Sequence, residues 1–176
     1  MQSPISTTLP SKTPRHGGAS GAAPTAQGPL VGVFETLVKE HQTAADLLAR
    51  LVHQSAASRQ QAWPIVRRQL LSHDRAEELE IYAALEGYDG ARDILEHHKL
   101  EAGELEGALN ELDAIDYDSD QWLSKLSDIV ALFNDHVRDE ETEYFPRMQQ
   151  LLGEDKARDL HDRFVSAQRE VIHTLV

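Results

Sequence analysis

The chain contains nearly the same ten-residue stretch twice, HDRAEELEIY at residues 73–82 and HVRDEETEYF at residues 136–145. Each copy places a histidine four residues before a glutamate. On a helix, side chains four residues apart project from the same face. An imidazole nitrogen and a carboxylate oxygen form a ligand pair that suits iron, manganese or zinc. The repeat therefore predicts a helical protein that binds metal from two of its helices.

The hydrophobic pattern from Leu30 onward is typical of helices, and the alternation expected of strands is missing. Gly and Pro cluster at the breaks between the apolar segments. We expect long helices over about residues 31–55, 62–85, 91–115 and 118–152, followed by a shorter helix over about residues 155–175. Four long helices joined by short breaks predict an all-α, antiparallel up-down four-helix bundle with an additional C-terminal helix.

Four residues give finer expectations about these helices. Pro64 is expected in the first turn of the second helix, where a missing amide is tolerated. Asp118 and the residue three positions later, Gln121, resemble a capping box that opens the fourth helix. Pro146 predicts a kink near the end of that helix.

The length of 176 residues is sufficient for one domain with a core. Residues 1–29 are rich in Ser, Thr, Pro, Gly and Ala and contain almost no large apolar residues. Such a segment buries too little surface to offset its ordering entropy, so we predict a disordered tail. Residues 30–176 are predicted to form the helical domain.

The composition excludes several classes of function. A net charge of -13 disfavours nucleic acid or an anionic membrane as a partner, because both are polyanions. The absence of cysteine excludes disulfides, thiolate metal sites and cysteine nucleophiles, so any metal must be held by nitrogen and oxygen. No apolar run approaches the roughly 20 residues that span a bilayer, and the N-terminus lacks the pattern of a secretory signal. We therefore expect a cytoplasmic location.

The candidate ligands share one property, an inward-facing position on a helix. Each motif is preceded in the chain by a further histidine on an earlier helix. At about 100° per residue, all four histidines lie at the centre of an apolar stripe, and both motif glutamates lie within about 40° of it. Burying two carboxylates costs free energy unless they are paired or bind a metal. The predicted metal ligands are His41, His73, Glu77, His98, His136 and Glu140.

Six ligands around one bundle axis suit two metal ions better than one. The expected division is His41 and His73 on one ion, His98 and His136 on the other, with Glu77 and Glu140 bridging. Such a site leaves coordination positions open for a small ligand from solution.

Five neighbouring residues are expected to play lesser parts. His97 lies about 100° away from the stripe of His98 and is interpreted as peripheral. Glu78 and Glu141 are expected to point outward into solvent. Glu80 and Glu143 return to the inner face one turn later, where they either hydrogen-bond the ligands or face solvent at the mouth of the bundle.

A ferritin-like di-iron bundle is an alternative, since that class uses Glu-x-x-His pairs on two helices. Here Glu170 and His173 form one such pair on the last helix, and no second copy exists. We interpret this pair as a coincidence. His16, His53 and His161 have no partner pattern and are expected at the surface.

The pattern of single histidines and His-x-x-x-Glu pairs resembles the hemerythrin-like HHE cation-binding domain family, over about residues 31–152. The stretch EETEYFP at residues 140–146 strengthens this resemblance. It implies a four-helix bundle around a non-haem di-iron centre with oxo and carboxylate bridges. Members of the family bind dioxygen, sense oxygen or iron, or handle nitric oxide and peroxide.

One departure from the family pattern bears on function. Oxygen-carrying hemerythrins have a fifth histidine, in a His-x-x-x-His pair on the third helix, whereas this chain has Ile94 and Ala102 at the two positions that would complete it. The chain is more similar to the four-histidine, two-glutamate members that are linked to the repair of iron centres under nitrosative stress. Reversible oxygen carriage is therefore less expected than a role in redox chemistry or iron handling.

We thus expect a protein that holds two iron ions and binds or senses dioxygen, nitric oxide or peroxide, in stress responses or iron homeostasis. Three alternatives remain open. The centre could consume nitric oxide or peroxide as an enzyme, although the sequence supplies no separate acid–base groups. The domain could be a metal-dependent regulatory module that a protein partner recognises. The histidines and glutamates could also hydrogen-bond one another without metal.

Overall fold

The computed structural model describes residues 28–175, and the predicted tail at residues 1–29 lies outside them except for its last two residues. The six α-helices are α1 (Val33–Val52), α2 (Ala56–Glu77), α3 (Arg92–Asp113), α4 (Asp120–Asp139), α5 (Phe145–Leu152) and α6 (Glu154–Thr174). Within the described residues there is no strand. The prediction of an all-α fold is confirmed.

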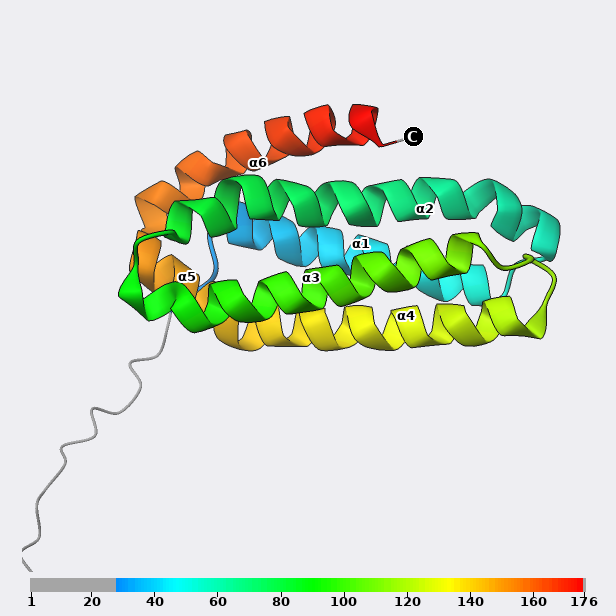
Figure 1. Cartoon of the computed structure of the whole chain (residues 1–176). Coiled ribbons are helices and arrows are strands. Elements are labelled where there is room, and N and C mark those ends of the chain that lie inside the picture. The colour runs from blue at the N-terminus through cyan, green and yellow to red at the C-terminus, as the bar shows by residue number, and fades with distance from the viewer. Residues whose placement is uncertain (1–27, 176) are drawn as a thin grey trace, which may run out of the picture.

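Helices α1 to α4 lie side by side with alternating direction, as Figure 1 shows. Helix α5 turns away from the line of α4, and the chain then turns back so that α6 packs against α2 and α1. The architecture is therefore the predicted four-helix bundle with an added C-terminal helix. None of the helices between residues 28 and 175 is both long and apolar enough to cross a membrane.

Serine caps determine where two of the helices begin. The Ser55 side chain accepts a hydrogen bond from the Ser58 amide, so α2 begins at Ala56, about two turns earlier than expected. Pro64 consequently lies inside α2 and not in its first turn. In α4 the cap is Ser119, one residue after the predicted Asp118.

The C-terminal part also differs from the expectation. Helix α6 has 21 residues and is as long as the bundle helices, so the prediction of a shorter helix is wrong. Pro146 lies at the start of α5, at the junction where the chain leaves the line of α4. A missing amide is tolerated there because the first turn of a helix has no partner for it.

Two π-helical segments interrupt the bundle helices, η1 (Glu78–Tyr82) after α2 and η4 (Glu140–Tyr144) after α4. Each begins at or directly after the glutamate of a repeated motif. A π-turn closes hydrogen bonds over five residues instead of four and therefore rotates less per residue than an α-turn. Positions beyond Glu77 and Glu140 therefore depart from the 100° spacing of a regular helix. Short 3₁₀ segments η2 (Ala83–Leu85) and η3 (Asp89–Ala91) lead into α3.

Two apolar clusters fill the interior, one toward each end of the bundle. One cluster includes Phe34, Ile81 and Phe145, and α6 contributes Phe164 to it. The other is built around Trp63 and Trp122, whose rings meet edge to face at a centroid distance of 6.0 Å. Along each of the four bundle helices, the inward-facing histidines and glutamates lie between these two clusters.

Candidate metal centre

The six predicted ligands meet in the interior of the bundle, and all four bundle helices contribute. The carboxylates of Glu77 and Glu140 are fully buried, with 0% of their side-chain surface exposed. The histidine side chains are also shielded, and His73 is the most exposed of them at 12%. The contributing elements are α1 (His41), α2 (His73, Glu77), α3 (His98), α4 (His136) and η4 (Glu140).

One group of ligand atoms comes from α1 and α2. The Nε2 atoms of His41 and His73 face each other at 3.1 Å, and Nε2 of His73 lies 3.3 Å from Oε1 of Glu77. One atom from each of these three residues lies within 4.8 Å of the other two. Two imidazoles and a carboxylate thus converge on a single point, as ligands of one ion do.

A second group lies beside the first and includes a residue that the sequence did not indicate. Single oxygen or nitrogen atoms of Asp74, Glu77, His98 and His136 lie within 4.8 Å of one another. Glu77 belongs to both groups. Oε2 of Glu140 lies 3.4 Å from Nε2 of His136 and also 3.4 Å from Nε2 of His41. Both glutamates thus occupy positions between two histidine pairs, where bridging ligands would lie.

Carboxylates from adjacent helices orient three of the four histidines. The pairs are His41 Nδ1 with Glu141 at 3.0 Å, His73 Nδ1 with Glu40 at 2.8 Å, and His136 Nδ1 with Glu101 at 3.3 Å. A carboxylate that accepts the Nδ1 proton fixes the ring and leaves the Nε2 lone pair free for a metal. In each case Nε2 is the atom that faces the centre.

The prediction that Glu141 points into solvent is wrong. The side of η4 that carries Glu141 faces α1, and the Glu141 carboxylate forms a hydrogen bond with His41. Glu40 and Glu101 were missed altogether. A sequence signal existed for both, because Glu40 directly precedes His41 and Glu101 lies one turn after His98, but it could not be separated from the many surface glutamates of the chain.

The remaining glutamates lie away from the centre. Glu80 forms an ion pair with Arg163 of α6, and Glu143 is 62% exposed and pairs with Arg147. Glu143 thus faces solvent, which is one of the two expectations, whereas Glu80 meets neither, because it is only 20% exposed and pairs with Arg163. The π-turns shift both positions relative to a regular helix. Glu78 is exposed, as expected.

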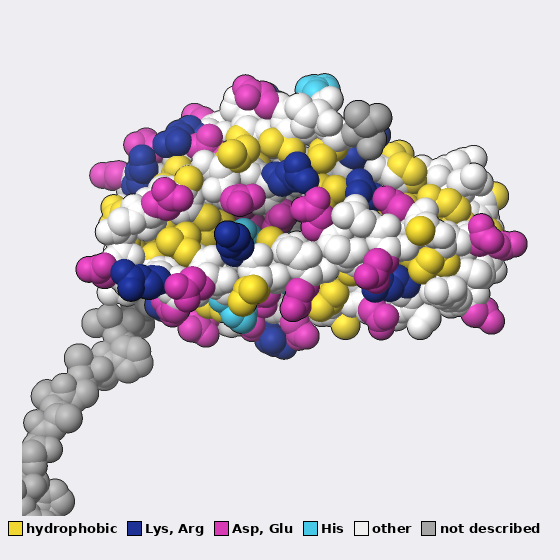
Figure 2. All heavy atoms as spheres, in the orientation of Figure 1, with side chains coloured by type: hydrophobic (Ala, Val, Ile, Leu, Met, Phe, Trp, Pro, Cys, Tyr) yellow, Lys and Arg dark blue, Asp and Glu magenta, His cyan; other side chains and the backbone are white. Residues whose placement is uncertain are grey.

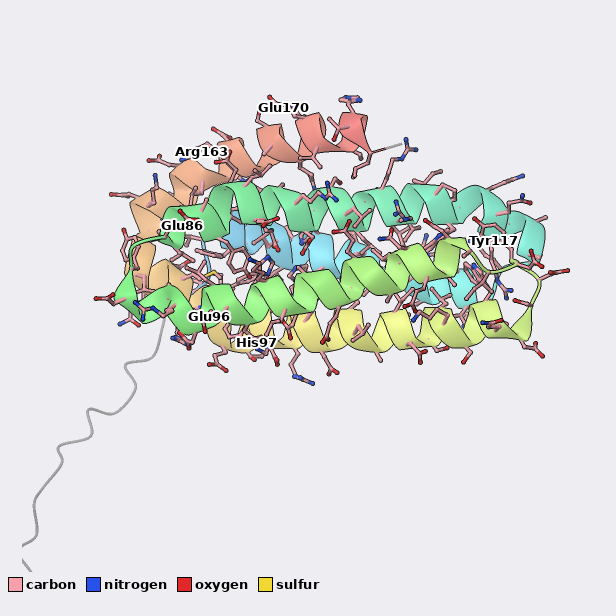
Figure 3. The ribbon with its side chains drawn as sticks, viewed as in Figure 1. Glu86, Glu96, His97, Tyr117, Arg163 and Glu170 are labelled. Atoms are coloured by element: carbon pink, nitrogen blue, oxygen red, sulfur yellow. The ribbon has the colours of Figure 1, made fainter. Side chains whose placement is uncertain are left out.

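His97 is peripheral, as predicted. It lies on the outer side of the bundle where α3 runs beside α4 (Figure 3), with 46% of its side chain exposed. Its Nε2 atom pairs with Glu101 at 2.9 Å. The lone histidine His53 is exposed, as expected, whereas His161 is half-buried and its Nδ1 lies 2.9 Å from the Thr36 hydroxyl. His16 lies outside the described residues.

The two buried carboxylates differ in their affinity for protons. Burial opposes ionisation of Glu77, but the charge of His73, whose Nε2 lies 3.3 Å from Oε1, lowers the pKa of Glu77 to about 2. Burial and the neighbouring charge of Glu77 raise the pKa of Glu140 to about 8. Without metal, one carboxylate is therefore ionised while the other retains its proton. Cations at the centre would allow both to ionise.

The pKa values of two of the histidines also differ from each other. Burial lowers the pKa of His98 to about 4. Burial also opposes protonation of His136, but the nearby carboxyl group of Glu140 and the hydrogen bond to Glu101 outweigh it and raise the pKa of His136 to about 9. His98 is therefore neutral at pH 7 and ready to act as a ligand, whereas a metal must displace a proton from His136.

Several buried polar atoms at the centre have no hydrogen-bond partner among the described residues. They are both carboxylate oxygens of Glu77, Oε2 of Glu140 and both ring nitrogens of His98. A buried polar atom without a partner costs about 1–3 kcal/mol. These atoms argue against the alternative of a hydrogen-bonded cluster without metal. Nitrogen and oxygen donors in this number and arrangement fit iron or a similar cation.

Tyr82 is a further residue of the centre that the sequence did not indicate. Its hydroxyl donates a hydrogen bond of 2.5 Å to Oε1 of Glu140. Its ring stacks on the imidazole of His98, with centroids 3.5 Å apart and planes at 13°. Burial raises the pKa of Tyr82 well above its usual range, so the hydroxyl keeps its proton. The position of Tyr82 depends on the π-turn of η1, which regular helical spacing does not predict.

Comparison with known protein families gives one match. The hemerythrin model, described as the Hemerythrin HHE cation binding domain, matches residues 32–148. No curated protein and no solved structure matches the chain. The match includes all six predicted ligands and ends before α6. The predicted domain at residues 30–176 is thus matched over most of its length. The chain belongs to the hemerythrin HHE cation-binding domain family.

Proposed function

We propose that the protein holds two iron ions inside the bundle and binds or senses a small ligand there, namely dioxygen, nitric oxide or peroxide. The observation that carries this proposal is the convergence of buried nitrogen and oxygen atoms from all four bundle helices, several of which have no hydrogen-bond partner among the described residues. The proposed ligands are His41 and His73 for one ion and His98 and His136 for the other, with Glu77 and Glu140 between them.

The iron ions, when bound, would supply a change of redox state and open coordination positions for a small ligand. The chain itself supplies the surroundings. Apolar clusters shield the centre along the bundle axis on both sides. The carboxylates of Glu40, Glu101 and Glu141 hold three imidazole rings in place. The Tyr82 hydroxyl holds a proton at Oε1 of Glu140.

Two cavities reach the centre, and each is lined by a histidine of a different proposed pair. One has a volume of about 650 Å³ and is lined by residues that include Tyr82 and His98. The other, of about 320 Å³, has a largely apolar lining that includes His73 and Phe133. Both are large enough to admit a diatomic molecule or peroxide.

The first experiment is elemental analysis of the purified protein together with its ultraviolet–visible spectrum before and after anaerobic reduction. We expect about two iron ions per chain, from the number of histidine pairs, and near-ultraviolet absorption that bleaches on reduction. The His136→Ala variant should lose metal, whereas His53→Ala should retain it, because His53 is exposed at the end of α1. Full metal content in a folded His136→Ala protein would refute the proposed ligand set.

An enzymatic role would use the same centre and is separated from simple binding by turnover. Steady-state consumption of nitric oxide or peroxide by the iron-loaded protein, lost in His136→Ala, would identify an enzyme. Stoichiometric spectral changes without turnover would instead identify a binding or sensing protein. Either outcome is compatible with a role in oxidative or nitrosative stress.

A regulatory role is the second candidate, and one contact favours it. Gln168 of α6 donates a hydrogen bond of 2.7 Å to Oε2 of Glu40, the same oxygen that lies 2.8 Å from Nδ1 of His73. Metal binding by His73 can therefore affect the docking of α6. We expect iron to protect α6 from proteolysis, and Gln168→Ala to weaken this protection. Glu170→Ala is the matched control, because Figure 3 shows Glu170 on the outer side of the same helix.

A further inference from the structure

Asp74 follows the first motif histidine directly and lies on α2 at the edge of the centre. Its Oδ1 atom is buried and has no hydrogen-bond partner among the described residues. One of its oxygens lies within 4.8 Å of ligand atoms of Glu77, His98 and His136. A buried carboxylate without a partner is unfavourable unless a proton or a cation neutralises it. Asp74 therefore resembles a ligand more than a structural residue.

The two motif copies differ at this position. Both follow the pattern His-x-Arg-x-Glu-Glu-x-Glu, but Asp74 in the first copy corresponds to Val137 in the second. We call the ligands around each of the two histidine pairs a half-site. The half-site of His41 and His73 consequently has no counterpart of Asp74. The two half-sites are therefore chemically different, although the motifs that form them are nearly the same.

The half-site of His98 also lacks an orienting carboxylate. The other three histidines each have a glutamate on Nδ1, whereas neither ring nitrogen of His98 has a hydrogen-bond partner among residues 28–175. His98 is held instead by stacking on Tyr82. An additional charged ligand would compensate for this less constrained imidazole.

Asp74 and His98 also line the same cavity, the one of about 650 Å³ that is bounded by α2, α3 and α6. Figure 2 shows the face that these helices form, where acidic side chains are spread over the whole visible surface. A cation that enters through this cavity meets Asp74 and His98 together.

We propose that Asp74 is a seventh protein ligand and binds the ion held by His98 and His136, which makes the two metal sites unequal. This inference rests on the proposed di-metal function. The site of His98 and His136 then has more carboxylate ligands than the site of His41 and His73. Oxygen-rich sites favour hard cations. The added negative charge also favours the higher oxidation state of iron at that position.

The test is anaerobic titration of the metal-free full-length chain with Fe(II), followed by Mössbauer spectroscopy of the loaded protein. We expect two binding steps and two distinct iron environments in the wild type. Asp74→Asn keeps the shape of the side chain but removes its charge. It should weaken one of the two steps by more than about tenfold, a loss at least as large as that caused by losing an outer carboxylate. The other step should be unchanged.

Two further variants make the result specific. Glu106→Gln alters another carboxylate that lines the same cavity, one that pairs with Arg75, and should leave both steps unchanged. Asp74→His replaces one ligand type by another and should retain both ions while shifting only one of the two Mössbauer signals. Circular dichroism confirms that each variant is folded.

The outcomes separate this inference from the function on which it rests. A wild-type chain that takes up fewer than two ions overturns the proposed di-iron function and the role of Asp74 with it. Two ions in the wild type and unchanged affinities in both Asp74 variants overturn the role of Asp74 alone. Loss of both ions in a folded Asp74→Asn protein also overturns it, because the proposal assigns Asp74 to one ion.

Discussion

The Tyr82 hydroxyl and Oε1 of Glu140 are 2.5 Å apart in the buried centre of the bundle. This hydrogen bond joins the π-turn that follows the first motif to the glutamate of the second motif. It also leaves Oε2 of Glu140 to face the histidines. The two motif copies are therefore linked directly, and one tyrosine determines which oxygen of Glu140 is available to a metal.

Removing this hydroxyl should destabilise the protein. In Tyr82→Phe, Glu140 loses its buried donor, so we expect a decrease of about 1–3 kcal/mol in the free energy of unfolding of the metal-free chain. Denaturant unfolding at pH 7 measures it. Tyr144→Phe is the control, because the Tyr144 ring packs on peripheral His97 instead of the centre. Equal losses in both variants would contradict a special role for the Tyr82 hydroxyl.

The outer carboxylates should affect metal affinity without changing the ligand set. Glu141→Gln removes the charge that orients His41, and we expect iron to bind about 10–100-fold more weakly. Competition with a chelator of known affinity provides the measurement. Glu143→Gln is the matched control two residues away, since its carboxylate is largely exposed and pairs with Arg147. A loss of affinity in the control alone would refute the assignment of Glu141.

The stability of the metal-free protein should decrease as the pH rises from about 6.5 to 9. The pKa of Glu140 is raised to about 8 and that of His136 to about 9, and the pKa of His73 is also raised. The folded chain thus binds more protons than the unfolded chain in this range. The stabilisation from these groups is complete below their pKa values in the unfolded chain. It is lost as the pH rises past their higher pKa values in the folded chain. Each extra proton contributes a slope of about 1.4 kcal/mol per pH unit.

Denaturant unfolding at several pH values tests this sign. Iron should reverse the trend, because metal binding displaces these protons and becomes tighter as the pH rises. Stability of the metal-free chain that increases between pH 6.5 and 9 would show that the histidines and Glu140 are not proton-loaded in the folded state.

Gly32 should be required for the contact between α1 and α6. Its φ is 60°, and a Cβ at this position would lie 2.3 Å from the backbone oxygen of Ala157. Gly32→Ala combines backbone strain with this clash and should lower the free energy of unfolding by more than about 2 kcal/mol. Gly87→Ala is the control, because Gly87 has a φ of 93° but open space around it. Thermal unfolding of both variants separates the clash from the strain.

The fold and the six central residues could be predicted because they depend on regular helical spacing. The apolar stripes place His41, His98 and the two motif pairs on the inner faces, and the structure brings all of them together. The helix starts were less predictable. Ser55 competes with Pro64 as the start signal of α2, and only the cap geometry shows that Ser55 is the start.

The rest of the site depends on features that have no local signal. Glu40, Glu101 and Glu141 act across helix interfaces, and nothing in their own helices distinguishes them from solvated glutamates. Asp74 and Tyr82 lie close to the motifs, but their roles follow from how α2 and η1 face α3 and η4. Positions after each motif glutamate could not be derived from the α-helical period, because the π-turns alter it.

The π-turns also divide the bundle into two halves with different helical phase. On α2 and α4, the residues before the turns supply nearly all of the contacts to the cluster of Trp63 and Trp122, and those after them pack on Phe34 and Phe145. The candidate metal centre thus lies where the helical phase changes along α2 and α4. If all five residues of η1 adopted regular α-helical geometry, everything beyond them would rotate by about 100°. Each π-turn therefore sets the phase between its motif glutamate and the aromatic residue that follows it, Tyr82 after Glu77 and Tyr144 after Glu140.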